Sequence, residues 1–563
     1  MGEIIKRVRE IRVLILAFLA ISIWGCKQEA PTSNDVVLWI PYNDSSEVAA
    51  NADHENSRMR YKLIQSKVLD KNDVFRPLYG EVSKFTEEQY KALKPLILDQ
   101  NIPGLQASVG AGKLTYEEIV LFYLYRIYTY ELDNTTTLNT VIALNEAALE
   151  EARLRDKERK EGYHPIYGMP VLLKDNIGTD GMNTTAGAVV FAENNAPDAF
   201  IVNQLKAKGA IILGKVNLSE WAYYLCDGCP VGYSAFGGQT LNPYGRRIFE
   251  TGGSSSGSGT SMAAQYAVAA VGTETSGSIL SPSSQNSVVG LKPTIGLLSR
   301  SGIVPISSTL DTPGPMTRNV TDNAILLDAM MGRDSEDLSS VEKNFGKEWY
   351  SELSSIDLNG KRFGAFSNLM ERDSIYRNTL DLLRSEGAEI IVLDPPRVAM
   401  DGFLSILNLD MRDDLPAYIE KNLNNTQEIS VKSVADIMTY NLSDSLTRIP
   451  YGQGRFEAVV SDTTTTEELK SIKKTLEEKT RIFFNSAIDT HELDAILSIN
   501  NFHAAYAAAA KYPALTIPMG YQPSGEPISL TFISRQFEEP ELLKLGAAYE
   551  RASNIRKSPE DYQ

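Results

Sequence analysis

The stretch Gly252-Gly-Ser-Ser-Ser-Gly-Ser-Gly259, followed by Gly272-Thr-Glu-Thr-Ser-Gly-Ser-Ile279, decides how this sequence is interpreted. On its own, a run of glycine and serine is typical of a flexible linker. Here the run leads into residues 262–271, a stretch of small and apolar residues that predicts a tightly buried helix. Because linkers do not normally lie between core elements, we expect both segments to be loops of the core itself.

Glycine and serine have chemical uses in such loops. Glycine lets the backbone approach a substrate closely, and successive N–H groups can point at one oxygen. A serine hydroxyl becomes a nucleophile once a base takes its proton. Neither loop carries a histidine, the usual base, but Lys174 ends the apolar run 169–173. Burial favours the neutral amine, so Lys174 is the alternative base.

Strands and helices alternate along the chain, which indicates an α/β fold. Short apolar runs predict strands at 169–175, 210–214, 363–366 and 389–393. Helices are expected after the capping residues Thr86 and Thr115, and over 146–160 and 375–386. No long linker interrupts 86–555, so we expect a single domain at 86–563, preceded by a tether and peripheral segment at 26–85.

Composition narrows the possible partners and cofactors. The net charge of -17 opposes binding to nucleic acid, which needs a positive field. Cys226 and Cys229 form one CxxC, which supplies two ligands where a closed zinc site needs four. A disulfide and two ordinary thiols both remain open for this pair. We expect no metal and no cofactor.

The N-terminus, MGEIIKRVREIRVLILAFLAISIWGCKQ, has the pattern of an export signal. Four cations precede an apolar run at 13–24, which is short for a membrane span but suits a signal peptide. Gly25-Cys26 then resembles a bacterial lipoprotein box. This predicts a signal peptide at 1–25, lipidation of Cys26, and an exported, membrane-anchored protein of the bacterial envelope, either periplasmic or on the surface. An uncleaved membrane anchor and a buried N-terminal helix are the alternatives.

Further motifs surround the two loops. VVGLKPTIGLLSRSGIVPIS and DTPGPMTRNV follow them, GMPVLLKDNIG precedes them, and YPALTIPMG lies near the C-terminus. Together these segments resemble the amidase-signature family, and especially its bacterial peptide amidases, over about residues 100–555. The resemblance implies a large twisted mixed β-sheet surrounded by α-helices. It also implies hydrolysis of a small-molecule or peptide carboxamide to a carboxylate and ammonia through an acyl-enzyme, without an obligate protein partner.

The resemblance also implies a role for each matched position. Lys174 is the base of a Ser-Ser-Lys triad, Ser254 follows a cis peptide bond and relays the proton, and Ser278 is the acylated nucleophile. The oxyanion hole consists of the backbone N–H groups of Thr275, Ser276, Gly277 and Ser278.

Two departures from the family pattern concern the substrate. Leu280 and Ser281 stand where many members carry an arginine, which favours neutral amides over amides with a carboxylate. Residues 395–470 match no family pattern, and such mid-chain regions often shape the substrate pocket.

Two other functions are compatible with these motifs. One is the A-type component of an amidotransferase, which shares the fold and the triad but works in the cytosol with partner proteins. The other is a catalytically inactive binding protein that retains the amidase fold. The filled triad positions favour an active enzyme, and the export signal favours a hydrolase over the amidotransferase component.

Overall fold

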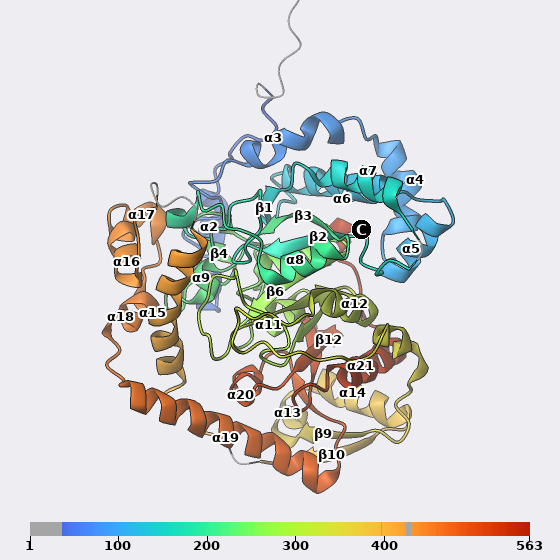
Figure 1. Ribbon diagram of the computed structural model, residues 1–563, viewed down its shortest axis with the longest axis vertical. Helices are drawn as coiled ribbons and strands as arrows, with labels where there is room; N and C mark the ends of the chain where they lie inside the picture. The colour runs from blue at the N-terminus through green and yellow to red at the C-terminus, as the bar shows by residue number, and fades with distance from the viewer. Residues whose placement is uncertain (1–35, 161, 396, 424–428) are drawn as a thin grey trace, which may run out of the picture.

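The computed structural model describes residues 36–160, 162–395, 397–423 and 429–563. Over these residues, eleven strands form one mixed sheet with helices on both faces (Figure 1). The α/β fold with a large mixed sheet is therefore confirmed. In spatial order the strands are β1 (Val141–Leu144), β3 (Ile211–Val216), β2 (Pro170–Lys174), β6 (Ala269–Glu274), β8 (Thr312–Thr317), β7 (Val289–Lys292), β12 (Ala514–Tyr521), β13 (Pro527–Ile533), β11 (Ala495–Ile499), β9 (Arg362–Phe366) and β10 (Glu389–Leu393).

Most helices of the first half surround the end of the sheet that carries β1, β2 and β3, and the last two pack on its middle strands (Figure 1). They are α2 (Ser45–Ala50), α3 (Lys71–Val82), α4 (Glu87–Ile97), α5 (Ile102–Gly110), α6 (Tyr116–Glu131), α7 (Ala148–Glu158), α8 (Phe200–Ala207), α9 (Glu220–Tyr223), α10 (Ser256–Ala263), α11 (Leu280–Gln285) and α12 (Val320–Met330). A two-stranded ribbon, β4 (Tyr233–Ser234) with β5 (Gly238–Gln239), lies between α9 and α10 in the sequence.

The helices of the second half form one lateral group and cover the other end of the sheet. The lateral group is α15 (Phe403–Asn422), α16 (Val434–Leu442), α17 (Ser445–Arg448) and α18 (Gly454–Ser461), and the long helix α19 (Thr466–His491) connects it to β11 (Figure 1). The remaining helices are α13 (Ser367–Arg372), α14 (Ser374–Ser385), α20 (Ala504–Ala510) and α21 (Glu539–Ser553).

Local sequence signals account for several of these elements. Thr86 and Thr115 begin α4 and α6 with complete capping boxes. In each box the threonine side chain accepts the backbone N–H of the third helical residue, and the side chain of that residue accepts the backbone N–H of the threonine. The predicted strands at 169–175, 210–214, 363–366 and 389–393 correspond to β2, β3, β9 and β10. The helices predicted over 146–160 and 375–386 correspond to α7 and α14.

The helix predicted over 262–271 is wrong in position. The helix α10 begins inside the glycine–serine run and ends at Ala263, and β6 starts at Ala269. Gln265, with φ at 56°, turns the chain between them. The run 267–271 is apolar throughout, and periodicity alone does not separate a buried helix from a buried strand. Here β6 is buried between β2 and β8, and Val271 pairs with Leu173 and Pro315.

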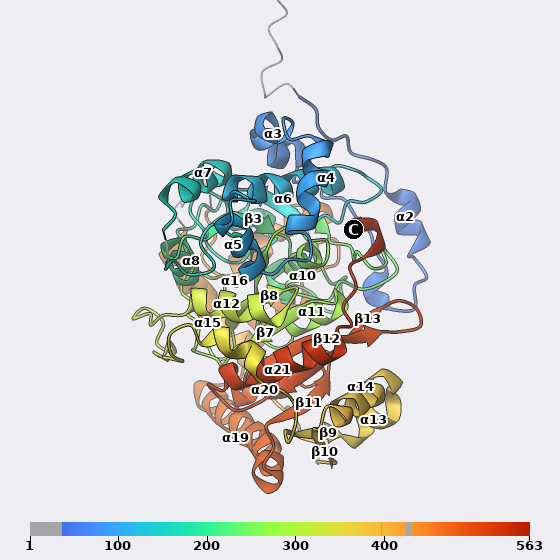
Figure 2. The ribbon, with the colours of Figure 1, turned by 90° about the vertical axis from the view of Figure 1, so that its right-hand side faces the viewer.

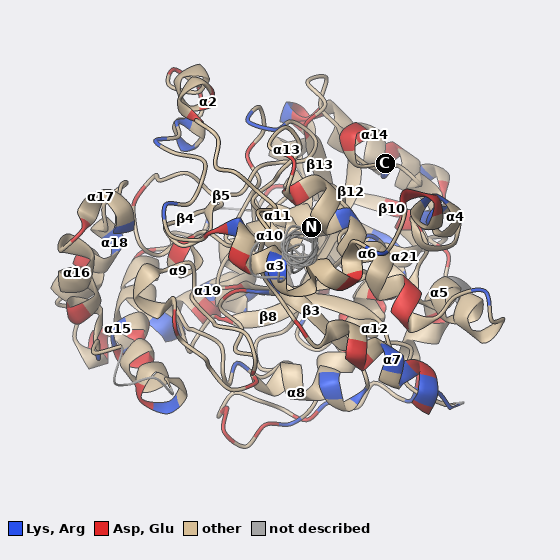
Figure 3. Ribbon diagram, turned by 90° about the horizontal axis from the view of Figure 1, so that it is seen from above, with Lys and Arg blue, Asp and Glu red and all other residues tan. Residues whose placement is uncertain are grey.

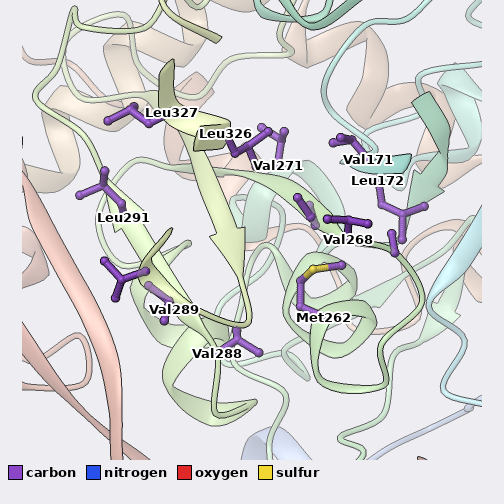
Figure 4. Packing of buried hydrophobic residues seen from close by; sticks show 14 of the residues in the cluster. Val171, Leu172, Met262, Val268, Val271, Val288, Val289, Leu291, Leu326 and Leu327 are labelled. Atoms are coloured by element: carbon purple, nitrogen blue, oxygen red, sulfur yellow. The ribbon is translucent and has the colours of Figure 1, made fainter. Parts of the chain in front are cut away.

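The core lies where these central elements meet. Leu172 of β2 lies near Met262 and Val268, whereas Val171 points to the opposite face of the strand, where Leu326 and Leu327 of α12 cover the sheet (Figure 4). This packing leaves the ends of β2 and β6, which carry Lys174 and Glu274, rigidly supported inside the protein.

The described part of the N-terminal segment is joined to this core. Met59, Ile64 and Phe75 are almost fully buried in the main cluster, and the Asn72 side chain accepts the backbone N–H of Leu38 at 2.7 Å. In the view of Figure 3, acidic and basic segments are interspersed along the surrounding helices. Among the described residues, no helix is long and apolar enough to cross a membrane.

Candidate active site

The lysine singled out from the sequence lies at the carboxyl end of β2, with no exposed surface. Its Nζ lies 2.7 Å from Ser254 Oγ, 2.8 Å from Thr273 Oγ1 and 3.1 Å from the Thr273 carbonyl oxygen. Strand β6, parallel to β2 and adjacent to it, brings Thr273 to this point. The strand pairing thus fixes the amine against the serine.

Burial lowers the pKa of Lys174 from its ordinary value near 10.5 to about 7, while the carboxylates of Asp311 and Glu274 oppose this shift. The side chain of the adjacent Asp175 points away from this amine. Its carboxylate accepts hydrogen bonds from Thr185 and lies 3.5 Å from the Lys215 amine. Lys174 therefore has no directly paired acid among the residues that the structure describes, and near neutral pH a large fraction of it is uncharged.

The loop before α10 places Ser254 beside the lysine. The peptide bond between Gly253 and Ser254 is cis, as the resemblance implied. Gly252 has φ at 63°, and a side chain there would meet Pro282 Cα at 2.7 Å. The next residue, Ser255, donates its N–H to the Ser278 carbonyl oxygen at 3.2 Å, which joins this loop to the one that carries Ser278.

The second loop, Thr275 to Ser278, lies on the wall of a cavity of about 310 Å³. Glu274 fixes the end of this loop, because the Glu274 carboxylate accepts the N–H groups of the next two residues, Ile279 at 2.7 Å and Leu280 at 3.0 Å. Burial raises the pKa of the Glu274 carboxyl, and hydrogen bonds from backbone N–H groups, that of Gly277 among them, oppose the rise, so the Gly277 N–H is shared with Glu274. Thr275 donates its hydroxyl to Asp311 at 2.5 Å.

The structure therefore brings all the predicted triad and oxyanion positions to one place, with Lys174 and Ser254 in direct hydrogen-bond contact. Three supporting residues were missed in the sequence: Thr273, Glu274 and Asp311. Each stands inside a motif already quoted, GTETSGSI or DTPGPMTRNV. The sequence shows that these residues are polar or acidic, but which groups they contact depends on the pairing of β6 with β2 and β8.

Charged side chains at the cavity are paired with one another. Arg58 lies 3.6 Å from Glu250, and Arg455 lies 2.6 Å from Asp227. All four line the cavity. Both arginines come from outside the loop Thr275 to Ser278, yet each has an acid partner in the same wall.

The rest of the wall is largely apolar and aromatic. Tyr223 and Tyr224 lie on one side, and α15 contributes Phe403, Leu404 and Leu407. With Arg455 of α18, these residues show that the segment 395–470 does supply part of the pocket.

The CxxC pair is a disulfide, so of the possibilities left open by the sequence the structure contains the bonded form. Cys226 and the following Asp227 line the cavity, and the bond to Cys229 closes this short loop. The loop thus holds the acid that pairs with Arg455.

Comparisons with known proteins agree with this geometry. The family model described as Amidase matches residues 118–505. A probable amidase of Arabidopsis thaliana is 35% identical over 82% of this chain and 92% of its own length. The A-type component of the glutamyl-tRNA(Gln) amidotransferase of an Exiguobacterium species is 30% identical over 82% of this chain and 99% of its own.

Solved structures show the same fold. An amidase family protein from Bacillus anthracis is similar at a TM-score of 0.84 and 38% identity, over 89% of this chain and 100% of that one. The peptide amidase of Stenotrophomonas maltophilia has a TM-score of 0.75 and 34% identity, over 82% of this chain and 99% of that one.

These comparisons contradict the prediction of a lipoprotein with a signal peptide and a membrane anchor. A lipoprotein box is a bacterial signal, but the relatives include a plant protein described simply as an amidase, and the similar bacterial structure is described as a peptide amidase. Residues 1–35, with Cys26, lie outside the described residues. That prediction rested on a short apolar run and one cysteine, and no other motif in the sequence supported it. The location in the envelope stays a prediction.

The family match spans well over half of the chain, and the relatives cover most of it at 30% identity or more. The buried lysine–serine contact beside a glycine-rich loop is the arrangement that the motifs implied. The chain therefore belongs to the amidase-signature family and is a hydrolase acting on amide C–N bonds.

Proposed function

We propose that this enzyme hydrolyses a neutral carboxamide by acylation of Ser278, with Lys174 as the base and Ser254 as the proton relay. The observation that carries the proposal is the 2.7 Å contact between the Lys174 amine and Ser254 Oγ, in a site that lowers the lysine pKa to about 7. A buried amine with a large uncharged fraction near neutral pH, in contact with a serine hydroxyl, is what a lysine-based proton transfer requires.

The reaction proceeds in two halves. Neutral Lys174 takes the proton of Ser254, which takes that of Ser278, and the Ser278 oxygen attacks the amide carbon. The negative charge on the former carbonyl oxygen is stabilised by the N–H groups of the 275–278 loop, with that of Gly277 shared with Glu274. Collapse breaks the C–N bond, and the proton returns through Ser254 to the departing ammonia. Water then hydrolyses the ester by the same route and releases the carboxylate.

The substrate class follows from the pocket. A cavity of about 310 Å³ has room for a small molecule or the end of a peptide. Its aromatic side offers apolar contact, and among the described residues its charged side chains are all in two ion pairs, so none is free to bind a substrate carboxylate. The likeness to a peptide amidase supports the same class of substrate.

Two alternatives remain relevant to the test. An amidotransferase component is favoured by the likeness to the A-type proteins of that complex, and the argument against it from export no longer applies. The net charge of -17 still opposes a tRNA-bound complex. An inactive amidase fold is the other alternative.

The decisive experiment is labelling with a fluorophosphonate, followed by intact-mass and peptide analysis. We expect one adduct, on Ser278, none in Ser278→Ala, and normal labelling in Ser281→Ala, whose serine lines the same cavity. Ammonia release from a library of neutral amides should be lost in Ser278→Ala, by several orders of magnitude. An adduct on another serine would refute the assignment, and a wild type that never labels would favour the inactive fold. Labelling without ammonia release from any free amide would favour the amidotransferase component.

A further inference from the structure

A second cavity lies at the opposite end of the sheet from β1. Strands β11, β9 and β10 are adjacent in that order and run parallel. The chain passes from β9 through α13 and α14 to β10, and then returns through α19 to β11 on the other side of β9. Figure 2 shows α13 and α14 on one side of these strands and α19 on the other. The carboxyl ends of β9 and β11 therefore form a topological switch point, the place where open α/β sheets bind ligands.

The cavity at this point measures about 760 Å³. Its wall consists of residues at or just after the strand ends: Phe366 and Leu369 for β9, Leu393 for β10, and Ile499 and Phe502 for β11. A cavity of this size at a switch point has the usual dimensions of a small-molecule site.

Aromatic rings dominate the wall. His503 stacks on Phe366 with the ring centres 4.2 Å apart, and Phe483 and Tyr506 pack edge to face at 5.0 Å beside them. Burial lowers the pKa of His503 to about 4, so this ring is neutral at neutral pH. Phe502, by contrast, is 62% exposed although it lines the cavity. An exposed ring above a floor of stacked rings is suited to contact with a flat aromatic ligand.

The acidic side chains of the cavity wall make hydrogen bonds within the protein, whereas among the described residues its arginines do not. Asp373 caps α14 by accepting the Tyr376 N–H at 2.8 Å, and Asp394 lies 3.4 Å from the Ser367 hydroxyl. Arg372 and Arg397 also line the cavity, and within the described chain neither guanidinium has an ion pair or hydrogen bond. The wall thus offers free cations beside aromatic rings, which suits an anionic group on the ligand.

This cavity is separate from the catalytic pocket but adjoins it. The two have no lining residue in common. The turn after β11 divides them, because Asn501 lines the catalytic pocket whereas Phe502 and His503 line the second cavity. The amide of Asn501 lies 3.0 Å from where a Cβ on Gly277 would stand, so the turn touches the proposed oxyanion loop.

We propose that this switch-point cavity binds a small molecule with a flat aromatic ring and a carboxylate. The ring lies against Phe502 and Phe366, and the carboxylate pairs with Arg372. This binding is independent of amide hydrolysis, so the proposal does not depend on the proposed triad.

Titration calorimetry of the full-length protein with 1-naphthoate tests the proposal. We expect saturable binding that weakens as salt is raised and is weaker for the neutral 1-naphthalenemethanol. Phe502→Ala should raise the Kd about tenfold through loss of the ring contact. Arg372→Gln should raise it about fivefold and remove most of the salt dependence. Both side chains are exposed, so neither change should affect folding.

Three matched variants serve as controls. Leu446→Ala removes an exposed apolar side chain of α17, and Arg384→Gln an exposed arginine of α14, both outside the cavity. Leu404→Trp narrows the catalytic pocket instead. All three should bind 1-naphthoate like the wild type. The proposal is overturned if no saturable binding occurs, if Phe502→Ala and Arg372→Gln bind unchanged, or if Leu404→Trp alone loses binding.

Discussion

The lowered pKa of Lys174 makes a quantitative prediction about how the reactivity of Ser278 depends on pH. A value of about 7 in place of 10.5 means that the site disfavours the ammonium form by about 5 kcal/mol. Lysine accepts a proton only when it is neutral, so reactivity should rise with pH and level off above the pKa. About one hundredth of the lysine is neutral at pH 5, about half at pH 7, and nearly all at pH 9. An unshifted lysine would still be almost entirely charged at pH 7.

The rate of fluorophosphonate labelling measures this dependence in the free enzyme without a known substrate. We expect the second-order rate constant to rise about tenfold per pH unit below 7 and to reach a plateau by about pH 8 to 9. Lys174→Arg should lower the plateau roughly 10²- to 10⁴-fold, because arginine keeps its charge throughout this range.

Lys208→Arg is the matched control. Lys208 is a half-buried lysine whose pKa is also lowered by burial, but it donates to the carbonyls of Asp328 and Ala329, away from the pocket. Its profile should follow the wild type. The reasoning fails if labelling still rises tenfold per unit at pH 9, or if Lys174→Arg labels at the wild-type rate.

Three further predictions concern the pocket. Asp227→Asn should free Arg455 and raise kcat/KM several-fold for an amide that bears a carboxylate, relative to its neutral analogue. The control Asp381→Asn breaks a surface ion pair on α14 and should leave this ratio unchanged. Equal selectivity in the two variants would contradict the argument that Asp227 neutralises Arg455. Gly277→Ala places a side chain at φ 108° and 3.0 Å from the Asn501 amide, so kcat should fall at least about tenfold with little change in Tm; unchanged turnover would show that the loop is not constrained. Activity should survive prolonged EDTA treatment, since lysine rather than metal-bound water acts as the base in the proposed mechanism; loss that added zinc restores would disprove it.

Much of the fold could be predicted because several signals are local. The capping box at Thr115 and the apolar runs that become β2 and β9 depend on a few neighbouring residues. The error at 262–271 arose where the local pattern was ambiguous. Whether the Ala/Val run becomes a helix or a strand depends on partners that stand about 100 residues earlier in β2 and 45 later in β8.

The candidate active site also combines features that the sequence predicts with contacts that it does not. Lys174, Ser254 and Ser278 lie in motifs that are recognisable from the sequence, but the contacts that tune them are long-range. Asp311 influences the lysine charge only because β8 returns beside β6, and Arg58 reaches the pocket only because its segment packs on the core. The lipoprotein pattern at Cys26 was not supported by any second motif, and the prediction made from it was wrong.

The pocket wall has a consequence for protein engineering. The proposed catalytic groups stand on buried strands and loops of the sheet, whereas Phe403, Leu404 and Arg455 come from the lateral helices and are partly exposed to solvent. Substitutions at partly exposed positions of this kind usually change stability little, whereas changes near Lys174 disturb a close-packed interior. Selectivity and chemical competence are therefore encoded in physically separate parts of the chain. A combinatorial library confined to α15 and α18 should retrieve variants with new amide preferences while most of its members remain folded and reactive toward a serine probe.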